Sequence, residues 1–261
     1  MEDKSYAKMK GYMLGQPRLV NSDGMYEVVG RASISPIDKQ VPELSQKIAA
    51  KNNHIYSYEF GGDDVLQQID LVLEIKKNHI GNKPCTLFTP ATAEYWDDEK
   101  LKEFDKIIIK RLSINDWGNS QFLRTETLSE SDYLNMDEKI KSKIVFFVDY
   151  EHSDISNCKD ENGSLKLLFE FIDWAKKLGV KEVIFLEREK GVRVFPIARN
   201  SLILSGWHLK AAKATEEAGK LYSLMAVENS HMKIVFKTRV FAENSDIWNL
   251  ARVHYYYEIF N

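Results

Sequence analysis

Cysteine is scarce in this sequence, and its scarcity excludes two kinds of stabilisation. The two cysteines, Cys85 and Cys158, form no CxxC pair and no cluster with histidine. Structural zinc sites and disulfide frameworks are built from such groupings. We therefore expect neither a zinc site nor a disulfide framework, and a reducing cytoplasm is the compartment that fits this usage best.

Long apolar segments are absent as well. A helix that crosses a bilayer needs about 20 predominantly apolar residues, and no run in the sequence reaches that length. The first residues, MEDKSYAKMKGYMLG, begin with charged side chains and lack the apolar core of a secretion signal. We expect no signal peptide and no membrane partner.

Neither sign of charge dominates the chain. It carries 36 basic and 39 acidic side chains, a net charge of -3. Nothing global attracts a polyanion, so nucleic acid is not an expected partner. The glycine patterns GxGxxG and GxxxxGK[ST] are missing too, which removes the commonest nucleotide-binding signatures, and we expect no bound cofactor.

The sequence does contain enough apolar residues for a sizeable core. Hydrophobic residues make up 44% of the chain and aromatic residues 11%, which suits one large domain or two small ones. Apolar runs of strand length alternate with segments of helical spacing, and this order predicts a mixed α/β fold. The expected strands are HIYSYEF, CTLFTP, KIVFFVDYE, KEVIFLE, LYSLMAVE and MKIVFKTRVF, and the expected helices include residues 165–178 and 196–204.

A polar stretch, residues 114–141, interrupts this alternation. Strand, loop, helix, strand and helix follow one another on both sides of it, which is a weak internal repeat of architecture. We therefore predict an N-terminal half over residues 1–115, a connection over 116–141 and a C-terminal half over 142–261. Each half is expected to have a central sheet flanked by helices.

Local patterns predict three further elements. Residues 10–35 are expected to form a β-hairpin around the turn sequence NSDG. A helix is expected around residues 97–112. The final segment, SDIWNLARVHYYYEIF, is expected to be an amphipathic helix capped by Ser245.

The stretch GGDDVLQQIDLVLEIKKNHIG has two interpretations with different functional consequences. As a strand it would place Glu74 and Lys76 on one face, near Asp64, and a nuclease could use such a set to hold Mg²⁺ and orient water. As a helix over residues 65–80 it has one apolar stripe, an N-cap at Asp64 and a stop at Gly81. We favour the helix because both of its ends are accounted for, and the nuclease stays the alternative.

No nucleophile paired with a base is recognisable elsewhere. His152 and His208 have no serine or cysteine elbow to accompany them. Asp149, Tyr150 and Glu151 close an apolar strand, where many α/β proteins place functional carboxylates. We interpret them as the point where that strand emerges into water, and we lean towards a protein without catalytic activity.

The C-terminal half resembles a known scaffold. Its stretches FFVDYE, EVIFLEREK, LSGWHL and LYSLMAVE, with ENGS before LLFEF, are similar to those of the ornithine decarboxylase antizymes. Antizymes are a non-catalytic branch of the acyl-CoA N-acyltransferase (GNAT-like) fold. The resemblance covers residues 143–228 and implies that the two halves are GNAT-like.

The resemblance also implies a function. Antizymes inhibit by binding a protein partner, so we expect a protein-binding inhibitor or regulator without catalysis. Glu187, Arg188 and Lys190 stand where antizymes carry a basic loop, and they are the expected protein-binding residues. An N-acyltransferase that uses acetyl-CoA is the alternative within the same fold, although EFGGDD and NCKDENGS depart from its cofactor loop.

Overall fold

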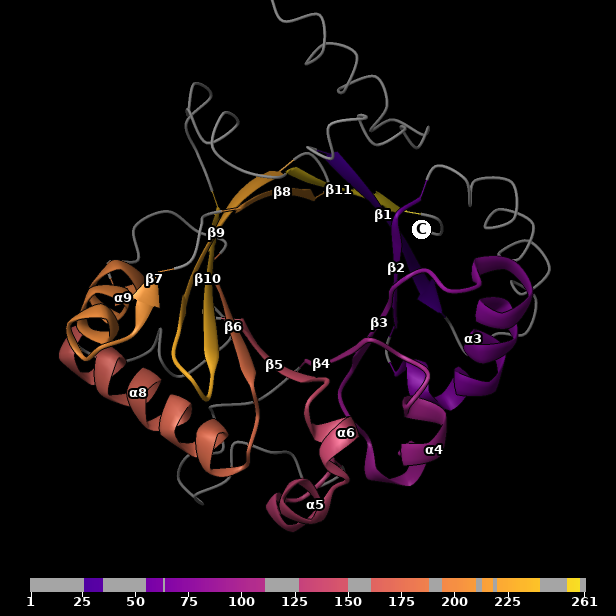
Figure 1. Ribbon diagram of the computed structural model, residues 1–261, viewed down its shortest axis with the longest axis horizontal. Helices are drawn as coiled ribbons and strands as arrows, with labels where there is room; N and C mark the ends of the chain where they lie inside the picture. Colours follow the sequence, from indigo (N-terminus) through magenta and orange to yellow (C-terminus); the bar gives the residue numbers. More distant parts are fainter. Residues whose placement is uncertain are drawn as a thin grey trace, which may run out of the picture.

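Figure 1 shows a closed ring of strands with helices around its outer side. The structure is a computed structural model, and it describes residues 26–34, 55–62, 64–110, 127–149, 161–187, 194–209, 213–217, 220–239 and 253–258. The strands are β1 (Tyr26–Ile34), β2 (Ser57–Gly62), β3 (Cys85–Thr89), β4 (Lys106–Ile109), β5 (Ile144–Asp149), β6 (Glu182–Glu187), β7 (His208–Leu209), β8 (Lys213–Glu217), β9 (Lys220–Glu228), β10 (Lys233–Arg239) and β11 (Val253–Glu258). The helices are η3 (Val65–Gln68), α3 (Ile69–Ile75), η4 (Lys76–Ile80), η5 (Ala93–Tyr95), α4 (Asp98–Leu101), α5 (Glu130–Asn135), α6 (Glu138–Lys141), α8 (Glu161–Lys177) and α9 (Val194–Leu204).

One pairing closes the sheet on itself. Neighbouring strands follow the order β10-β6-β5-β4-β3-β2-β1-β11-β8-β9, and β9 also pairs with β10, while β7 lies beside β9. From β8 round through β1 to β10 every pair is parallel. β9 runs antiparallel to both β8 and β10. The carboxyl ends of the parallel strands therefore meet at one end of the ring.

The mixed α/β fold expected from the sequence is confirmed, with helices flanking the sheet. The six expected strands occur as β2, β3, β5, β6, β9 and β10. Strands from both expected halves join one sheet, because β4 pairs with β5 across the expected connection. That connection contains α5 and α6, and the division into two GNAT-like halves stays a prediction.

Contacts between phenylalanine side chains show which face of the sheet is covered by helices. The ring centroid of Phe185 in β6 lies 5.9 Å from that of Phe171 in α8. Phe236 in β10 lies 5.9 Å from Phe185 and 5.2 Å from Phe195 in α9. Side chains alternate between the two faces of a strand, so the neighbours of these residues, such as Ile184, face the interior of the ring.

An ion-pair network joins three strands on the inner face at their amino ends, and we call this end the floor. Glu182 of β6 accepts hydrogen bonds from Lys106 of β4 (2.8 Å) and from Lys233 of β10 (3.0 Å). Burial alone would raise the pKa of the Glu182 carboxyl, but the two ammonium groups outweigh it and hold that pKa below its ordinary value. The floor thus ties β4, β6 and β10 together.

Three expected elements are corrected. Residues 253–258 form β11 rather than a helix, because they pair with β1 on one side and β8 on the other, and tyrosine and valine fit a sheet well. Of the helix expected over 97–112, the segment Asp98–Leu101 is helical and Lys106–Ile109 is β4, since consecutive isoleucines are stiff and favour strands. ENGS, expected as a loop, begins α8, whose first turn tolerates glycine and serine because its N–H groups lack intrahelical partners.

The expected N-terminal hairpin is not formed by β1. Its neighbours are two parallel strands, β2 and β11, whereas the arms of a hairpin are antiparallel. The other expected arm and Ser245 lie outside the described residues. Among the described helices, none has both the length and the apolar content needed to cross a bilayer.

We expect Glu182→Gln to lower the free energy of unfolding by about 1 kcal/mol at neutral pH, because the charged hydrogen bonds to two partly exposed lysines are weakened. The pKa of this carboxyl is lowered in the folded protein, so its stabilising effect is complete above the ordinary pKa and is lost as the pH falls through the folded-state pKa. Urea unfolding near neutral pH and again at about pH 3 should show the difference between wild type and variant shrink in acid.

Glu170→Gln is the control for this experiment. Glu170 pairs with Lys166 at 3.8 Å on the exposed side of α8, and loss of a surface pair changes stability by about 0.5 kcal/mol or less. If both variants lose the same free energy of unfolding, or if the difference between wild type and Glu182→Gln does not change with pH, the floor does not stabilise the ring.

Candidate functional site

The segment that could have formed a nuclease site is helical, as favoured from the sequence. Residues Val65–Gln68 form a 3₁₀ turn, Ile69–Ile75 an α-helix and Lys76–Ile80 a π-helical turn. The side chain of Asp64 caps its start by accepting from the Leu66 N–H at 3.1 Å. Gly81 ends it with a φ of 66°, a conformation that glycine adopts without strain.

This helix separates the three residues of the nuclease hypothesis. Glu74 lies ten residues beyond Asp64, about 15 Å along a helix axis, and its side chain is exposed. Lys76 lies 4.0 Å from Glu103 in an ion pair. Asp64, Glu74 and Lys76 therefore do not gather around one ion, which the alternative nuclease interpretation would require. No group of three metal-ligating side chains occurs within the described ranges.

Asp64 instead joins the ends of two neighbouring strands. Its Oδ1 accepts from the hydroxyl of Thr89 at 3.0 Å, and that hydroxyl in turn accepts from the Ala91 N–H at 2.9 Å. Thr89 is fully buried at the end of β3. The carboxylate thus fixes the start of η3 against β3, which is a structural role.

Of the three residues expected to bind a protein, Glu187 lies within the described part of the structure. Glu187 is the last residue of β6 and is 3% exposed, so its carboxylate is not available on the surface, which corrects that part of the assignment. The expected strand KEVIFLE already ended at Glu187, but sequence alone could not show that this end of the strand is buried. Arg188 and Lys190 lie outside the described residues.

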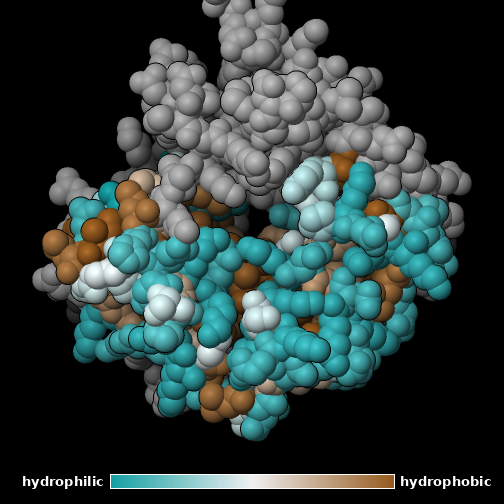
Figure 2. Space-filling model, in the orientation of Figure 1, coloured by the Kyte–Doolittle hydropathy of each residue, from teal (hydrophilic) through white to brown (hydrophobic). Residues whose placement is uncertain are grey.

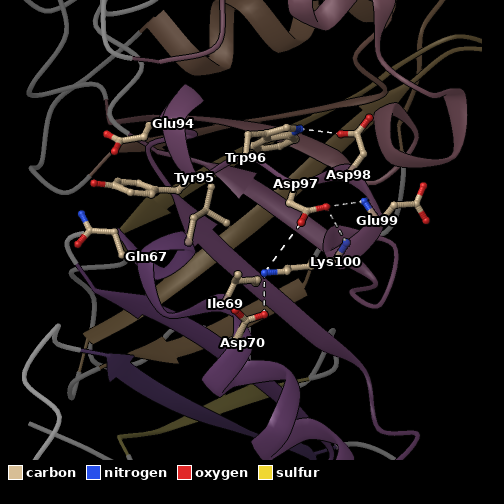
Figure 3. Close-up of a pocket in the computed structure, with 11 residues that line it drawn as sticks. Gln67, Ile69, Asp70, Glu94, Tyr95, Trp96, Asp97, Asp98, Glu99 and Lys100 are labelled. Carbon is tan, nitrogen blue, oxygen red and sulfur yellow. Dashed lines mark hydrogen bonds and ion pairs between the residues drawn. The ribbon is translucent and has the colours of Figure 1, made fainter.

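A pocket of about 600 Å³ lies between the start of α3 and the η5–α4 segment (Figure 3). Its lining is rich in carboxylates, and Tyr95 and Trp96 form part of its wall. The negative charge of Glu94 is the largest of the effects that raise the pKa of Tyr95, followed by partial burial. The pocket is therefore acidic and disfavours ionisation of this tyrosine.

The pocket's carboxylates already have local partners. Asp98 accepts from the Trp96 Nε1–H at 2.7 Å, and Asp97 caps α4 by accepting from the N–H groups of Glu99 and Lys100. Asp70 lies 2.7 Å from the Lys100 ammonium. These acidic residues therefore act as helix caps and ion-pair partners that fix α4 against α3, which is a structural role.

The described chain has an exposed apolar surface on α9 and β7, which we call the α9–β7 surface. Its members are Ile197 (38% exposed), Ile203 (36%), Leu204 (88%) and Leu209 (53%). In Figure 2 hydrophobic residues gather over α9 on the face shown. Sequence analysis missed this surface, although the helix is apolar around its circumference, a pattern typical of a helix covered on all sides.

Buried contacts hold this surface rigidly. On the opposite side of α9, Phe195 packs on Phe236, and the guanidinium of Arg199 lies 2.8 Å from the Met225 sulfur. Gly206, with a φ of 90°, turns the chain out of the helix. β7 then pairs with β9, so Leu204 and Leu209 are presented by fixed elements.

This chain is only weakly similar to known proteins. No protein-family model and no curated protein matches the chain. SuiB of Streptococcus suis bound to S-adenosylmethionine is similar with a TM-score of 0.44 and 13% identity, over 77% of this chain and 47% of SuiB. A second SuiB structure gives a TM-score of 0.43 and 13% identity, over 77% of this chain and 49% of that one. The chain spans about half the length of SuiB.

We expect Asp64→Ala to lower the free energy of unfolding by about 1–2 kcal/mol, because η3 loses its cap and the Thr89 hydroxyl loses its acceptor. Glu74→Ala should change it by about 0.5 kcal/mol or less, since Glu74 is exposed on the helix. Denaturant unfolding measures both. Asp64→Asn is the matched control, because the amide oxygen of asparagine still accepts these hydrogen bonds. If Asp64→Ala and Glu74→Ala lower the free energy of unfolding equally, Asp64 does not have the structural role described here.

Proposed function

We propose that this protein is a non-catalytic regulator that binds a partner protein through the α9–β7 surface, as antizymes act by binding theirs. Four of the large exposed apolar side chains lie together between positions 197 and 209, and contiguous apolar patches on a protein surface commonly mark interaction sites. This gathering is the observation that carries the proposal.

The residue types of the α9–β7 surface indicate what kind of surface the partner presents. From Val194 to Leu209 the sequence contains one arginine, Arg199, one histidine, His208, and no carboxylate. Asn200 and Ser205 are exposed beside the apolar residues and give a neutral polar rim. The partner therefore presents an apolar surface with hydrogen-bonding groups around it, an arrangement typical of protein interfaces.

The stretches that resemble antizymes include part of the α9–β7 surface. Its stretch LSGWHL is the sequence from Leu204 to Leu209, where α9 ends and β7 begins. Trp207 packs against the buried core and so anchors the exposed leucines on either side of it. In this proposal the protein works in the cytoplasm, in keeping with the few cysteines and the absence of a pairing pattern.

Leu204→Glu tests the proposal. A charge at the centre of an apolar interface is costly, and we expect it to weaken partner binding at least about tenfold. The full chain, immobilised, is used to retain proteins from lysate of the native host. The wild type should retain one protein in a stoichiometric amount that the variant loses, and titration of that purified protein should give the change in Kd.

Leu134→Glu is the matched control. Leu134 is 49% exposed on α5, outside the α9–β7 surface, so this change introduces the same charge without touching the proposed interface. Binding by the control should equal that of the wild type. A partner retained equally by all three proteins, or no stoichiometric partner in any, would refute the proposal, and self-association detected by sedimentation would assign the surface to a second copy.

Salt dependence gives a second test of the interface. Because the α9–β7 surface carries almost no charge, raising the salt from about 0.05 M to about 0.5 M should change Kd by less than about threefold. An interface built on charged side chains would weaken steeply over the same range. Steep weakening would therefore contradict the α9–β7 surface even if a partner is found.

A further inference from the structure

The pocket between the start of α3 and the η5–α4 segment carries an excess of negative charge. Five carboxylates line it, and Lys100 is the one cation among the described residues of the lining. Lys102 pairs with Glu99 at 2.5 Å from outside the lining, so three negative charges remain in excess. The hydrogen bonds that cap α4 do not change this balance, because backbone N–H groups are neutral. A ligand of this pocket is therefore expected to be positively charged.

The two ends of the pocket differ in how its charge is compensated. At one end the Lys100 ammonium lies 2.7 Å from Asp70 and 3.9 Å from Asp97. At the other end Glu94 lies beside the hydroxyl of Tyr95, which is a neutral group (Figure 3). Because the cation of the lining is engaged at the first end, the uncompensated charge is greatest at the Glu94 end.

A partly buried carboxylate beside the Glu94 end adds to this charge. Asp64 directly precedes η3, from which Leu66 and Gln67 line the pocket. Its charge is one of the causes that raise the pKa of Tyr95, so these two side chains lie close together. Its Oδ1 accepts two hydrogen bonds, whereas its buried Oδ2 has no hydrogen-bond partner among the described residues. A buried carboxylate oxygen without a partner is costly, and a cation in the pocket offsets part of that cost.

Aromatic and apolar side chains complete the wall. Tyr95 and Trp96 are half-buried and pack against the hydrophobic core, and the Trp96 Nε1–H bond to Asp98 fixes the indole further. Leu66 and Ile69 are buried residues of the lining. Aromatic rings attract cations, and a guanidinium group stacks on them better than an ammonium group because it is planar and more weakly hydrated. Aromatic rings beside carboxylates therefore favour a guanidinium ligand.

We propose that this pocket binds a guanidinium group, carried by a free small molecule or by an arginine side chain. The guanidinium lies at the Glu94 end, where the Glu94 carboxylate accepts its hydrogen bonds and the rings of Tyr95 and Trp96 lie against its planar face. The charge of Asp64 strengthens the attraction without contact. A volume of about 600 Å³ is within the range of small-molecule sites.

This site is separate from the α9–β7 surface. α3 and α4 lie on the opposite side of the ring from α9 (Figure 1), and none of the residues of the α9–β7 surface lines the pocket. Guanidinium binding therefore does not depend on the proposed regulatory function, and the two proposals stand or fall separately.

N-acetyl-arginine methylamide, with N-acetyl-citrulline methylamide as its neutral counterpart, tests the proposal on the full chain. The two probes differ in a guanidinium against a urea group, so the difference between them reports the charge. We expect the arginine probe to shift the NMR signal of the Trp96 indole N–H, which Trp96→Phe identifies. The citrulline probe should bind at least about tenfold more weakly, the effect of losing one charge-assisted hydrogen bond.

Two variants remove negative charge from the Glu94 end. Glu94 is exposed, so Glu94→Gln should leave the fold intact and weaken the arginine probe about tenfold. Asp64→Asn keeps an acceptor for the cap of η3 but removes the buried charge, and it should weaken the arginine probe about threefold, because this charge acts without contact. Both variants should change citrulline binding by less than about threefold, since its urea group is neutral.

Glu170→Gln on α8 and Leu204→Glu on α9 are the controls, because both lie outside the pocket lining. Each should bind the arginine probe as the wild type does. The proposal is overturned if the wild type binds neither probe, if it binds the two probes equally, or if Glu94→Gln and Asp64→Asn bind the arginine probe as tightly as the wild type.

A pentapeptide separates the two sources of the guanidinium group. Ala-Ala-Arg-Ala-Ala, blocked at both ends, presents the same side chain within a peptide backbone. If it binds at least about tenfold more tightly than the single-residue probe, the backbone is recognised as well, and the pocket takes an arginine side chain of a peptide. If it binds no more tightly, the pocket takes a free guanidinium compound.

Discussion

The pairing of β9 with β10 is the constraint on which the rest of the structure depends. β9 is antiparallel to both β8 and β10 and so joins the two edge strands of the parallel part of the sheet. Its pairing with β10 consists of seven residue pairs, from Lys233 opposite Glu228 to Arg239 opposite Tyr222. The turn between these strands is set locally, because the side chain of Asn229 accepts from the N–H groups of His231 and Met232, both at 2.9 Å. Without this pairing the sheet would have two open edges, each a row of backbone groups without partners. With it, every strand of the ring has two neighbours, and the sheet gains an inside and an outside.

The distinction between inside and outside decides what each strand residue does. Among the outward residues, Phe146 and Phe185 both pack against Phe171 of α8, and Phe185 also packs against Phe195 of α9, within the main hydrophobic core. Among the described elements the helices lie on the outer side of the ring. On the inner face, charged side chains such as Glu182 of β6 and Lys237 of β10 are accommodated by ion pairs and an aromatic face. A single alternation along these strands thus separates outward residues that pack against the helices from inward residues that include charged side chains.

The α9–β7 surface follows from the same architecture. α9 must cover Phe236 with its inner side, which accounts for buried Phe195, but that requirement does not account for apolar Ile197 and Leu204 on its outer side. Exposed leucine adds nothing to the packing of the ring, and under the proposed function the outer side of this helix is the contact for a partner protein.

The sequence by itself determined the local elements with strong periodicity. The helix from Val65 to Ile80 follows from its apolar stripe and its two end residues, and β5 and β6 follow from apolar runs of strand length. Only the tertiary structure decided that Val253–Glu258 is a strand, because its conformation depends on pairing with β1 and β8, which are distant in sequence. It also decided that Glu187 is buried, that Asp64 and Glu74 are apart, and that Lys110, Lys237 and Arg239 share one end of a ring. Periodicity records which side of a strand or helix is apolar, but it does not record which strand lies beside which, and the functional surfaces arise from that arrangement.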